Sequence, residues 1–232
     1  MPSDRAQKPG RAPFVEGCID SIPVCISFAF LFFAVGNLCA THHYSLAQAA
    51  SMTALVFAAP LQVFIVQNGE TLSLAALVVA CVLINFIFLI MSSMLSEKFK
   101  KIALAKVLLS IPMLSASTFT LSNLKGESGS PFHYYLGVGA AAIGTALAAT
   151  VGGTIVAAKS DAYINDVVAI ILPVHFTALT ALMWPKLRPV LITVLSFLVA
   201  PIAGHWLGKL TVVVMPFVMA SLFLLWEKKD GK

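Results

Sequence analysis

Charge is scarce in this sequence. Only 11% of its 232 residues are Asp, Glu, Lys or Arg, whereas 59% are hydrophobic and the mean hydropathy is +0.93. A typical soluble domain carries about 25% charged residues. Runs of about 20 apolar residues, the length that spans a bilayer, recur along nearly the whole sequence and leave no room for a separate soluble domain. The composition therefore predicts an integral membrane protein.

Motifs of enzymes and metal sites are also lacking. There is no HExxH, no GxSxG and no glycine-rich phosphate loop, and the carboxylates lie almost entirely outside the apolar runs. Cys18, Cys25, Cys39 and Cys81 have no CxxC spacing, and the last three lie in apolar runs, which favours packing roles over a metal site or a disulfide. We therefore expect no enzyme activity, no metal and no cofactor.

The two ends of the sequence are polar. Residues 1–18 contain several prolines and lack the apolar core of a signal peptide, which indicates an uncleaved tail. We expect this tail, a transmembrane helical domain over residues 19–226 and a charged tail over 227–232. The excess of five positive charges sits at tails and helix ends, which suits anionic lipid head groups better than nucleic acid.

Hydropathy defines the expected helices. Apolar segments lie near residues 19–40, 45–67, 72–95, 102–122, 134–158, 167–184, 190–207 and 211–226. The last two are short and contain prolines and glycines, so each is also consistent with a half-helix that does not cross. We predict an all-α, polytopic (multi-pass) membrane helix bundle of seven or eight hydrophobic segments, with helices broken at proline and glycine.

Orientation rests on lysine and arginine in short loops. If all eight segments cross, the dense cluster "EKFKK" at residues 97–101 falls on the opposite side from the basic N-terminal tail, which weakens the assignment of an intracellular N-terminus. One re-entrant segment before residue 97 would remove the conflict. The segment that contains Pro60 is the obvious candidate.

Pro60 and Gln62 interrupt the apolar stretch "LVFAAPLQVFIVQNGE". Proline removes a backbone donor and clashes with the preceding turn, and an amide in hydrocarbon needs hydrogen-bond partners. We expect a broken helix here, whose freed backbone groups and Gln62 face protein or a central binding site. A bond from Gln62 to a neighbouring backbone group is the alternative.

Four further polar residues are candidates for a substrate or ion site. Asn85 and Ser92 share one helix face with Cys81 at about 100° per residue, and Asn85 alternatively bonds a neighbouring backbone group. His175 follows a proline and either relays a proton or packs as a neutral ring. Asp20 opens the first apolar segment, where an acid favours the helix dipole or binds a coupling ion.

Small residues recur every four positions in the segment near 134–158. Ala140, Gly144, Ala148 and Gly152 share a face that lets another helix approach closely. That neighbour is a helix of the same chain or a second membrane protein. A smooth wall of a substrate path is the remaining alternative.

Three ordered motifs resemble the AzlC family, the large subunit of branched-chain amino acid exporters. They are "FVEGCIDSIPVCISFAFLFFAVG", "SMTALVFAAPLQVF" and "CVLINFIFLIMSSML", over roughly residues 14–125. The matching residues are Phe14, Gly17, Pro23, Gly36, Phe57, Ala58, Gln62, Asn85, Leu89 and Ser92. Departures occur where the family has an arginine (here Ile87), an acidic pair (here Ala116 and Ser117) and a glycine (here Ala59).

The resemblance implies a secondary transporter of the bacterial inner membrane. Such a protein exports small hydrophobic, branched-chain amino acids, is proton-coupled and works with a small AzlD-like membrane subunit. By the same resemblance Pro60, Gln62, Asn85 and Ser92 belong to its signature segments. Because family charges are lost, the alternative is a degenerate paralogue, a non-transporting scaffold that binds a partner membrane protein.

Overall fold

A computed structural model describes residues 12–125, 130–172, 174–175, 177, 187–208 and 211–230. All regular elements in these ranges are helices, which confirms the all-α prediction. The elements are α1 (Pro13–Asp20), α2 (Ile22–Thr41), α3 (Leu46–Val56), α4 (Ala59–Asn68), α5 (Leu74–Lys98), α6 (Leu104–Ser110), η1 (Ile111–Met113), α7 (Ala116–Lys125), α8 (Pro131–Ala157), α9 (Ala162–Ala169), α11 (Leu187–Leu207) and α12 (Thr211–Asp230).

Four helices in the described ranges are long and apolar enough to cross a membrane: Ile22–Thr41, Leu74–Lys98, Pro131–Ala157 and Val190–Leu207. The expected count of seven or eight segments is not confirmed. Two predicted segments are each divided into shorter helices, because a proline interrupts the backbone hydrogen bonds of each. The tails at 1–11 and 231–232 lie outside the described residues.

The first division occurs at Pro60, as predicted. Phe57 ends α3 in the left-handed conformation, with φ of 40°, and Pro60 lies in the first turn of α4. The second division was not predicted. The segment expected at 102–122 consists of α6, the short η1 that contains Pro112, and α7. Each pair of short helices therefore has a break in the middle of an apolar stretch.

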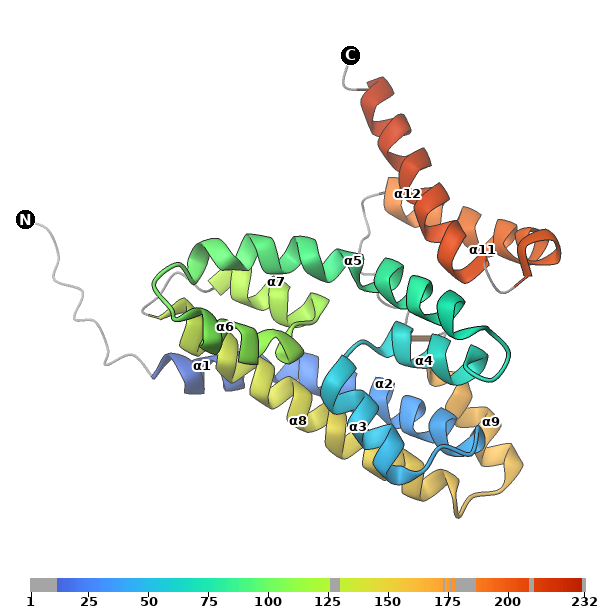
Figure 1. Ribbon diagram of the computed structural model, residues 1–232, viewed down its shortest axis with the longest axis horizontal. Helices are drawn as coiled ribbons and strands as arrows, with labels where there is room; N and C mark the ends of the chain where they lie inside the picture. Colours follow the sequence, from blue (N-terminus) through green and yellow to red (C-terminus); the bar gives the residue numbers. More distant parts are fainter. Residues whose placement is uncertain are drawn as a thin grey trace, which may run out of the picture.

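Both ends of the α3–α4 pair lie at the same end of the bundle. The hydroxyl of Tyr44, before α3, lies 3.2 Å from the position that a Cβ on Gly69, after α4, would occupy. Both ends of the α6–α7 pair lie at the opposite end of the bundle. There Lys98, at the end of α5, donates to the carbonyls of Ser122 and Asn123 in α7, at 3.3 and 3.0 Å. Each pair thus enters and leaves the bundle at one end, and we call the two the re-entrant pairs; Figure 1 shows α3–α4 toward the right and α6–α7 toward the left.

Helices α1 and α2 pack against α8 with their backbones almost touching. A Cβ on Gly36 would lie 2.1 Å from the Thr150 carbonyl oxygen, and one on Gly153 would lie 2.0 Å from the Phe33 carbonyl oxygen. Only glycine allows this approach. On the same face of α8, Ala142 and Ala146 are fully buried. This contact forms the rigid centre of the fold.

The predicted stripe of small residues on α8 lies on a different face. Gly144 and Ala148 are exposed, and a Cβ on Gly144 would meet nothing within 4 Å. The expectation that this stripe admits a helix of the same chain is therefore not met at Gly144 and Ala148, whereas Gly152 does face α2, since its Cβ would lie 3.9 Å from the Phe33 ring. Spacing alone could not choose the packed face, because the buried face of α8 is also rich in glycine and alanine.

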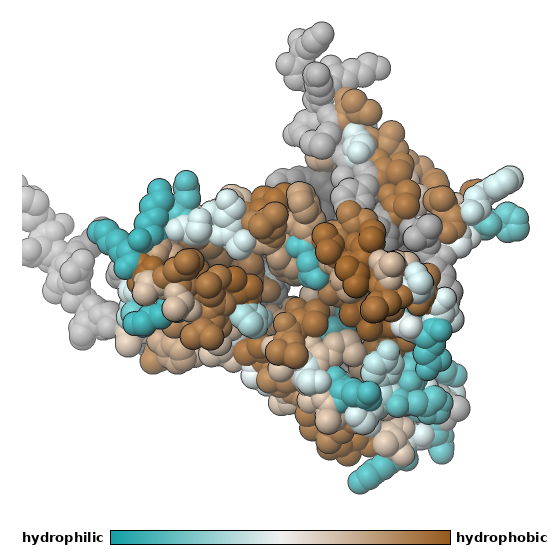
Figure 2. Space-filling model, in the orientation of Figure 1, coloured by the Kyte–Doolittle hydropathy of each residue, from teal (hydrophilic) through white to brown (hydrophobic). Residues whose placement is uncertain are grey.

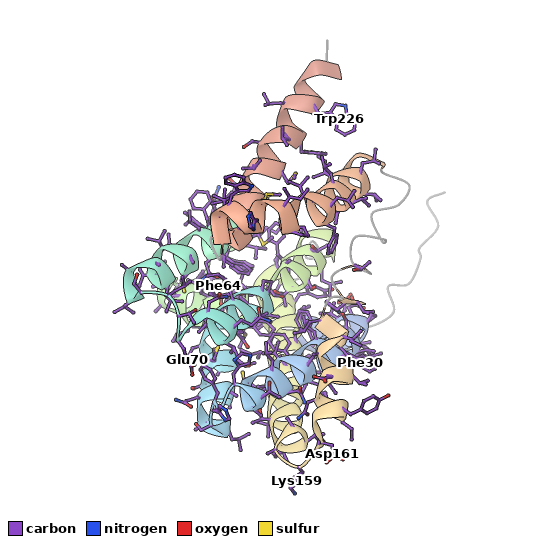
Figure 3. All side chains as sticks on the ribbon, turned by 90° about the vertical axis from the view of Figure 1, so that its right-hand side faces the viewer. Phe30, Phe64, Glu70, Lys159, Asp161 and Trp226 are labelled. Carbon is purple, nitrogen blue, oxygen red and sulfur yellow. The ribbon has the colours of Figure 1, made fainter. Side chains whose placement is uncertain are left out.

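Polar residues gather at the two ends of the bundle. We call the end that contains α1 and the start of α8 the first end; there Phe99, just before Lys100 and Lys101, packs against Phe132 with ring centroids 5.2 Å apart. At the second end Lys159 is accompanied by Glu70 and Asp161, toward the viewer in Figure 3. On the face shown in Figure 2, hydrophobic surface lies between hydrophilic side chains on the left and hydrophilic side chains on the right. The cluster "EKFKK" thus lies at the same end of the bundle as α1.

Candidate functional site

The two helix breaks line one cavity, which we call the central cavity. Its volume is about 270 Å³. Phe57 to Pro60 contribute from the first break and Ser115 to Ser117 from the second, while α2 and α5 supply the walls. The remaining lining residues are Ser27, Phe28, Leu31, Phe32, Ile84, Ile87, Phe88, Met91 and His175. Segments entering from opposite ends of the bundle therefore meet at the same cavity.

Two helix amino termini point to the central cavity. Helix α4 starts there at Ala59, and no side chain caps it. Helix α7 starts there after Ser115, whose Oγ accepts from the Thr118 N–H at 3.2 Å while the Thr118 Oγ1 accepts from the Ser115 N–H at 2.8 Å. Each helix amino terminus carries about half a positive elementary charge. Together they make the cavity favourable for a negatively charged group.

Three phenylalanines form an aromatic wall of the central cavity. Phe28, Phe32 and Phe57 are all buried, with ring centroids 5.5 to 5.6 Å apart. Phe32 and Phe57 stack, and Phe28 meets both edge-on. Among the described lining residues none is Asp, Glu, Lys or Arg. The described part of the site therefore combines an apolar wall with helix dipoles and contributes no charged side chain.

Among the described lining residues of this cavity, His175 is the one whose side chain can change charge near neutral pH. Its Nδ1 lies 3.4 Å from the Ser27 Oγ on α2, and it makes at least one further interaction. Of the residues predicted from sequence, the structure brings His175 and Pro60 together here. His205, by contrast, is exposed on α11 and lies outside this site.

Gln62 lies behind the wall of the central cavity and does not line it. Its side chain is 0% exposed, and its Oε1 accepts from the Thr53 hydroxyl at 3.1 Å. Thr53 in turn lies 3.0 Å from the Thr150 hydroxyl on α8. The Gln62 Nε2 has no hydrogen-bond partner in the described part of the chain. Gln62 therefore links α4 to α3 through Thr53, and Thr53 links both to α8.

A second cavity of about 590 Å³ lies beside the first, and we call it the lateral cavity. Cys81, Asn85 and Ser92 line it from one face of α5, as their spacing predicted. The Ser92 hydroxyl bonds the Leu89 carbonyl of its own helix at 2.9 Å. Phe88 lines both cavities. Its ring therefore stands between the two spaces.

Asp20 takes part in neither cavity. It is the last residue of α1 and does not open a membrane segment as expected, since α2 begins at Ile22. Its Oδ2 accepts from the Tyr134 hydroxyl on α8 at 3.0 Å. This bond joins α1 to α8. An ion-coupling role for Asp20 gains no support from this placement.

Sequence reasoning missed Ser27, Ser115 and Phe88. Ser115 had a readable signal, because serine is a preferred N-cap residue and this one follows Pro112 closely. Ser27 and Phe88 had none, because serine and phenylalanine in apolar helices are common. Only the tertiary arrangement places these side chains at the cavities.

Comparison with known proteins identifies the family of the chain. Residues 23–159, more than half of its length, match the family model described as AzlC protein. The matched range contains both re-entrant pairs and every lining residue of the central cavity except His175. No curated protein and no solved structure matches the chain. The chain is a membrane protein and belongs to the AzlC family.

Proposed function

We propose that this chain is a secondary transporter that exports small hydrophobic, branched-chain amino acids through the central cavity, with no covalent catalytic step. The observation that carries the proposal is the meeting of two helix breaks at one cavity. Broken helices entering from opposite ends are the usual way in which transporters place half-helix ends at a substrate site. Family membership supports a transport-related role.

The lining of the central cavity fits the three parts of such an amino acid. The carboxylate faces the amino termini of α4 and α7, whose partial charges sum to about one positive charge. The ammonium group lies against the faces of Phe28 and Phe57, which attract cations. The aliphatic side chain contacts Leu31, Ile84 and other apolar wall residues. A charged side chain would find no ionic partner there.

The departures from the family motifs support recognition without fixed charges. Ile87 and Ala116, where the motifs have an arginine and an acid, both line the central cavity. Opposite charges at these positions would neutralise each other, so their joint replacement leaves the cavity without an unpaired ion. This chain therefore binds its solute by helix dipoles and apolar contacts.

His175 is the proposed coupling group. Export coupled to protons requires a side chain that changes charge near neutral pH, and histidine does so. His175→Gln keeps hydrogen-bonding atoms but cannot carry the proton, so it should retain amino acid exchange and lose stimulation by a pH gradient. His205→Gln on exposed α11 is the matched control and should keep that stimulation.

The proposed location is the bacterial inner membrane, crossed several times, with the first end of the bundle in the cytoplasm. The described lysines at that end are Lys98, Lys100, Lys101, Lys106 and Lys125, while the second end has Lys159 together with the acidic Glu70 and Asp161. An excess of lysine in short loops favours the cytoplasmic side. Both re-entrant pairs are needed for this distribution.

A small AzlD-like membrane subunit is the proposed partner. The exposed stripe around Gly144 and Ala148 offers it a face where helix backbones can approach closely. The same exposed stripe favours the second candidate function, a non-transporting scaffold that only binds a partner membrane protein. The two candidates differ in solute flux, because a scaffold would move none.

Flux in proteoliposomes tests the proposal. The full chain, with and without the small subunit, is reconstituted and loaded with radiolabelled leucine, isoleucine, valine or methionine, and efflux is followed with and without a pH gradient. Lysine and glutamate serve as charged controls. We expect efflux of at least one apolar amino acid and rejection of both charged ones. Folded protein in the vesicles without flux of any of the four would contradict transport.

A further inference from the structure

A third cavity lies at the first end of the bundle, apart from the central and lateral cavities. Its volume is about 270 Å³. It lies between the turn after α5, the start of α6 and the first turns of α8, and its lining residues are Lys101, Ile102, Ala103, Lys106, Phe132, His133 and Leu136. It shares no lining residue with the central or the lateral cavity.

The polar part of this cavity is basic. Lys101 and Lys106 are exposed, and none of the described lining residues is acidic. Lys98 nearby is already engaged, since it donates to two carbonyls of α7. His133 bonds the Ser130 hydroxyl at 2.7 Å through Nδ1, so Nε2 is its second polar atom. Two ammonium groups and an imidazole around one hollow suit a phosphate group.

The rest of the surroundings is apolar. Phe132 is only 5% exposed and forms part of the wall. Outside the cavity, α6 presents leucines that are largely exposed: Leu104 at 71%, Leu108 at 53% and Leu109 at 79%. A free phosphate would contact only the basic hollow, whereas a phospholipid also places its acyl chains along these leucines. The combination therefore suits an amphiphilic ligand.

We propose that this cavity binds the head group of an anionic phospholipid, with the phosphate between Lys101 and Lys106 and the acyl chains along the leucines of α6. The lipid holds α6 against the start of α8. Because α6 is half of a re-entrant pair, the bound lipid stabilises the arrangement around the second break. The site lies at the lysine-rich end, where anionic head groups and basic residues meet.

Lipid-dependent thermal stability tests this site. The full chain in mixed micelles is titrated with dioleoyl phosphatidylglycerol, with dioleoyl phosphatidylcholine, or with inorganic phosphate, and its unfolding temperature is recorded. We expect stabilisation by phosphatidylglycerol alone. The double variant Lys101→Gln/Lys106→Gln should bind phosphatidylglycerol about 30-fold more weakly, since each basic group is worth about 1 kcal/mol near anionic lipid.

Controls separate the site from general charge. Lys159→Gln, at the second end, should respond like the wild type, and Lys101→Arg/Lys106→Arg should retain most of the response. Equal stabilisation of the wild type and the glutamine double variant by phosphatidylglycerol would overturn the proposal. Equal stabilisation by inorganic phosphate would also overturn it, because it would make the site a free-phosphate site. If the glutamine double variant fails to fold while the arginine double variant folds, the site needs positive charge. Lipid titration of each single glutamine variant then tests whether that charge binds phosphatidylglycerol.

Discussion

Replacing Gly36 with alanine should loosen the contact between α2 and α8 and destabilise the whole fold. The added Cβ would lie 2.1 Å from the carbonyl oxygen of Thr150, whereas ordinary contacts begin at 3.4 Å, so the helices must separate by roughly 1 Å. Because the clash is with backbone, no side chain can rotate away. Overpacking of this kind costs about 2 kcal/mol. In a chain of this size that loss lowers the unfolding temperature by about 4–8 °C.

Thermal unfolding in detergent, followed by circular dichroism, measures this change, and Gly144→Ala is its control. A Cβ on Gly144 would meet nothing within 4 Å, and alanine favours a helix over glycine by up to about 1 kcal/mol. The control should therefore unfold at the wild-type temperature or slightly above it. An unchanged unfolding temperature for Gly36→Ala, or equal losses in the two variants, would refute the proposed backbone contact.

Three further predictions concern the cavities. Ile87→Arg should reduce folded yield, because it buries a charge that costs about 3 kcal/mol. Ala116→Asp should reduce the yield less, since an acid can take up a proton, and the double variant should recover part of the yield. A double-mutant cycle without coupling would show that the two positions do not interact. Gln62→Met should lower the free energy of unfolding by only about 0.6 kcal/mol, because Thr53 keeps its bond to Thr150. Asn85→Ala should lower leucine flux and leave the unfolding temperature at the wild-type value. Lost flux with Gln62→Met and lost stability with Asn85→Ala would contradict the positions assigned to these two residues. Phe88→Trp should slow leucine flux and Phe88→Ala should raise passive leak from loaded vesicles, and leak equal to wild type in both would exclude Phe88 as the barrier between the cavities.

The first helix break and the α5 face of the lateral cavity could be predicted from the sequence. Pro60 has a local effect on the backbone that tertiary structure cannot remove, and the break lies within three residues of it. The spacing of Cys81, Asn85 and Ser92 follows from the helix repeat alone. Features that depend on backbone chemistry or periodicity were therefore predictable.

The remaining features were missed or could not be predicted from the sequence. Hydropathy at 102–122 reports apolar length and says nothing of whether the helix continues, so the break at Pro112 was missed, although it has the same backbone cause as the break at Pro60. Asp20 was placed at the opening of a membrane helix, because hydropathy does not register the boundary between α1 and α2 that Ser21 and Pro23 mark. Gly153 rather than Gly152 makes the close contact on α8, and one residue corresponds to about 100° around the helix.

The central claim is that the solute crosses the membrane through the cavity where the two helix breaks meet. Leucine counterflow in proteoliposomes tests it most directly, with Ala116→Trp, which fills that cavity at the second break, against Ala75→Trp on the exposed surface of α5. The account predicts that Ala116→Trp abolishes counterflow while both variants unfold at the wild-type temperature and Ala75→Trp exchanges leucine like the wild type. Wild-type counterflow in a folded Ala116→Trp variant would contradict it.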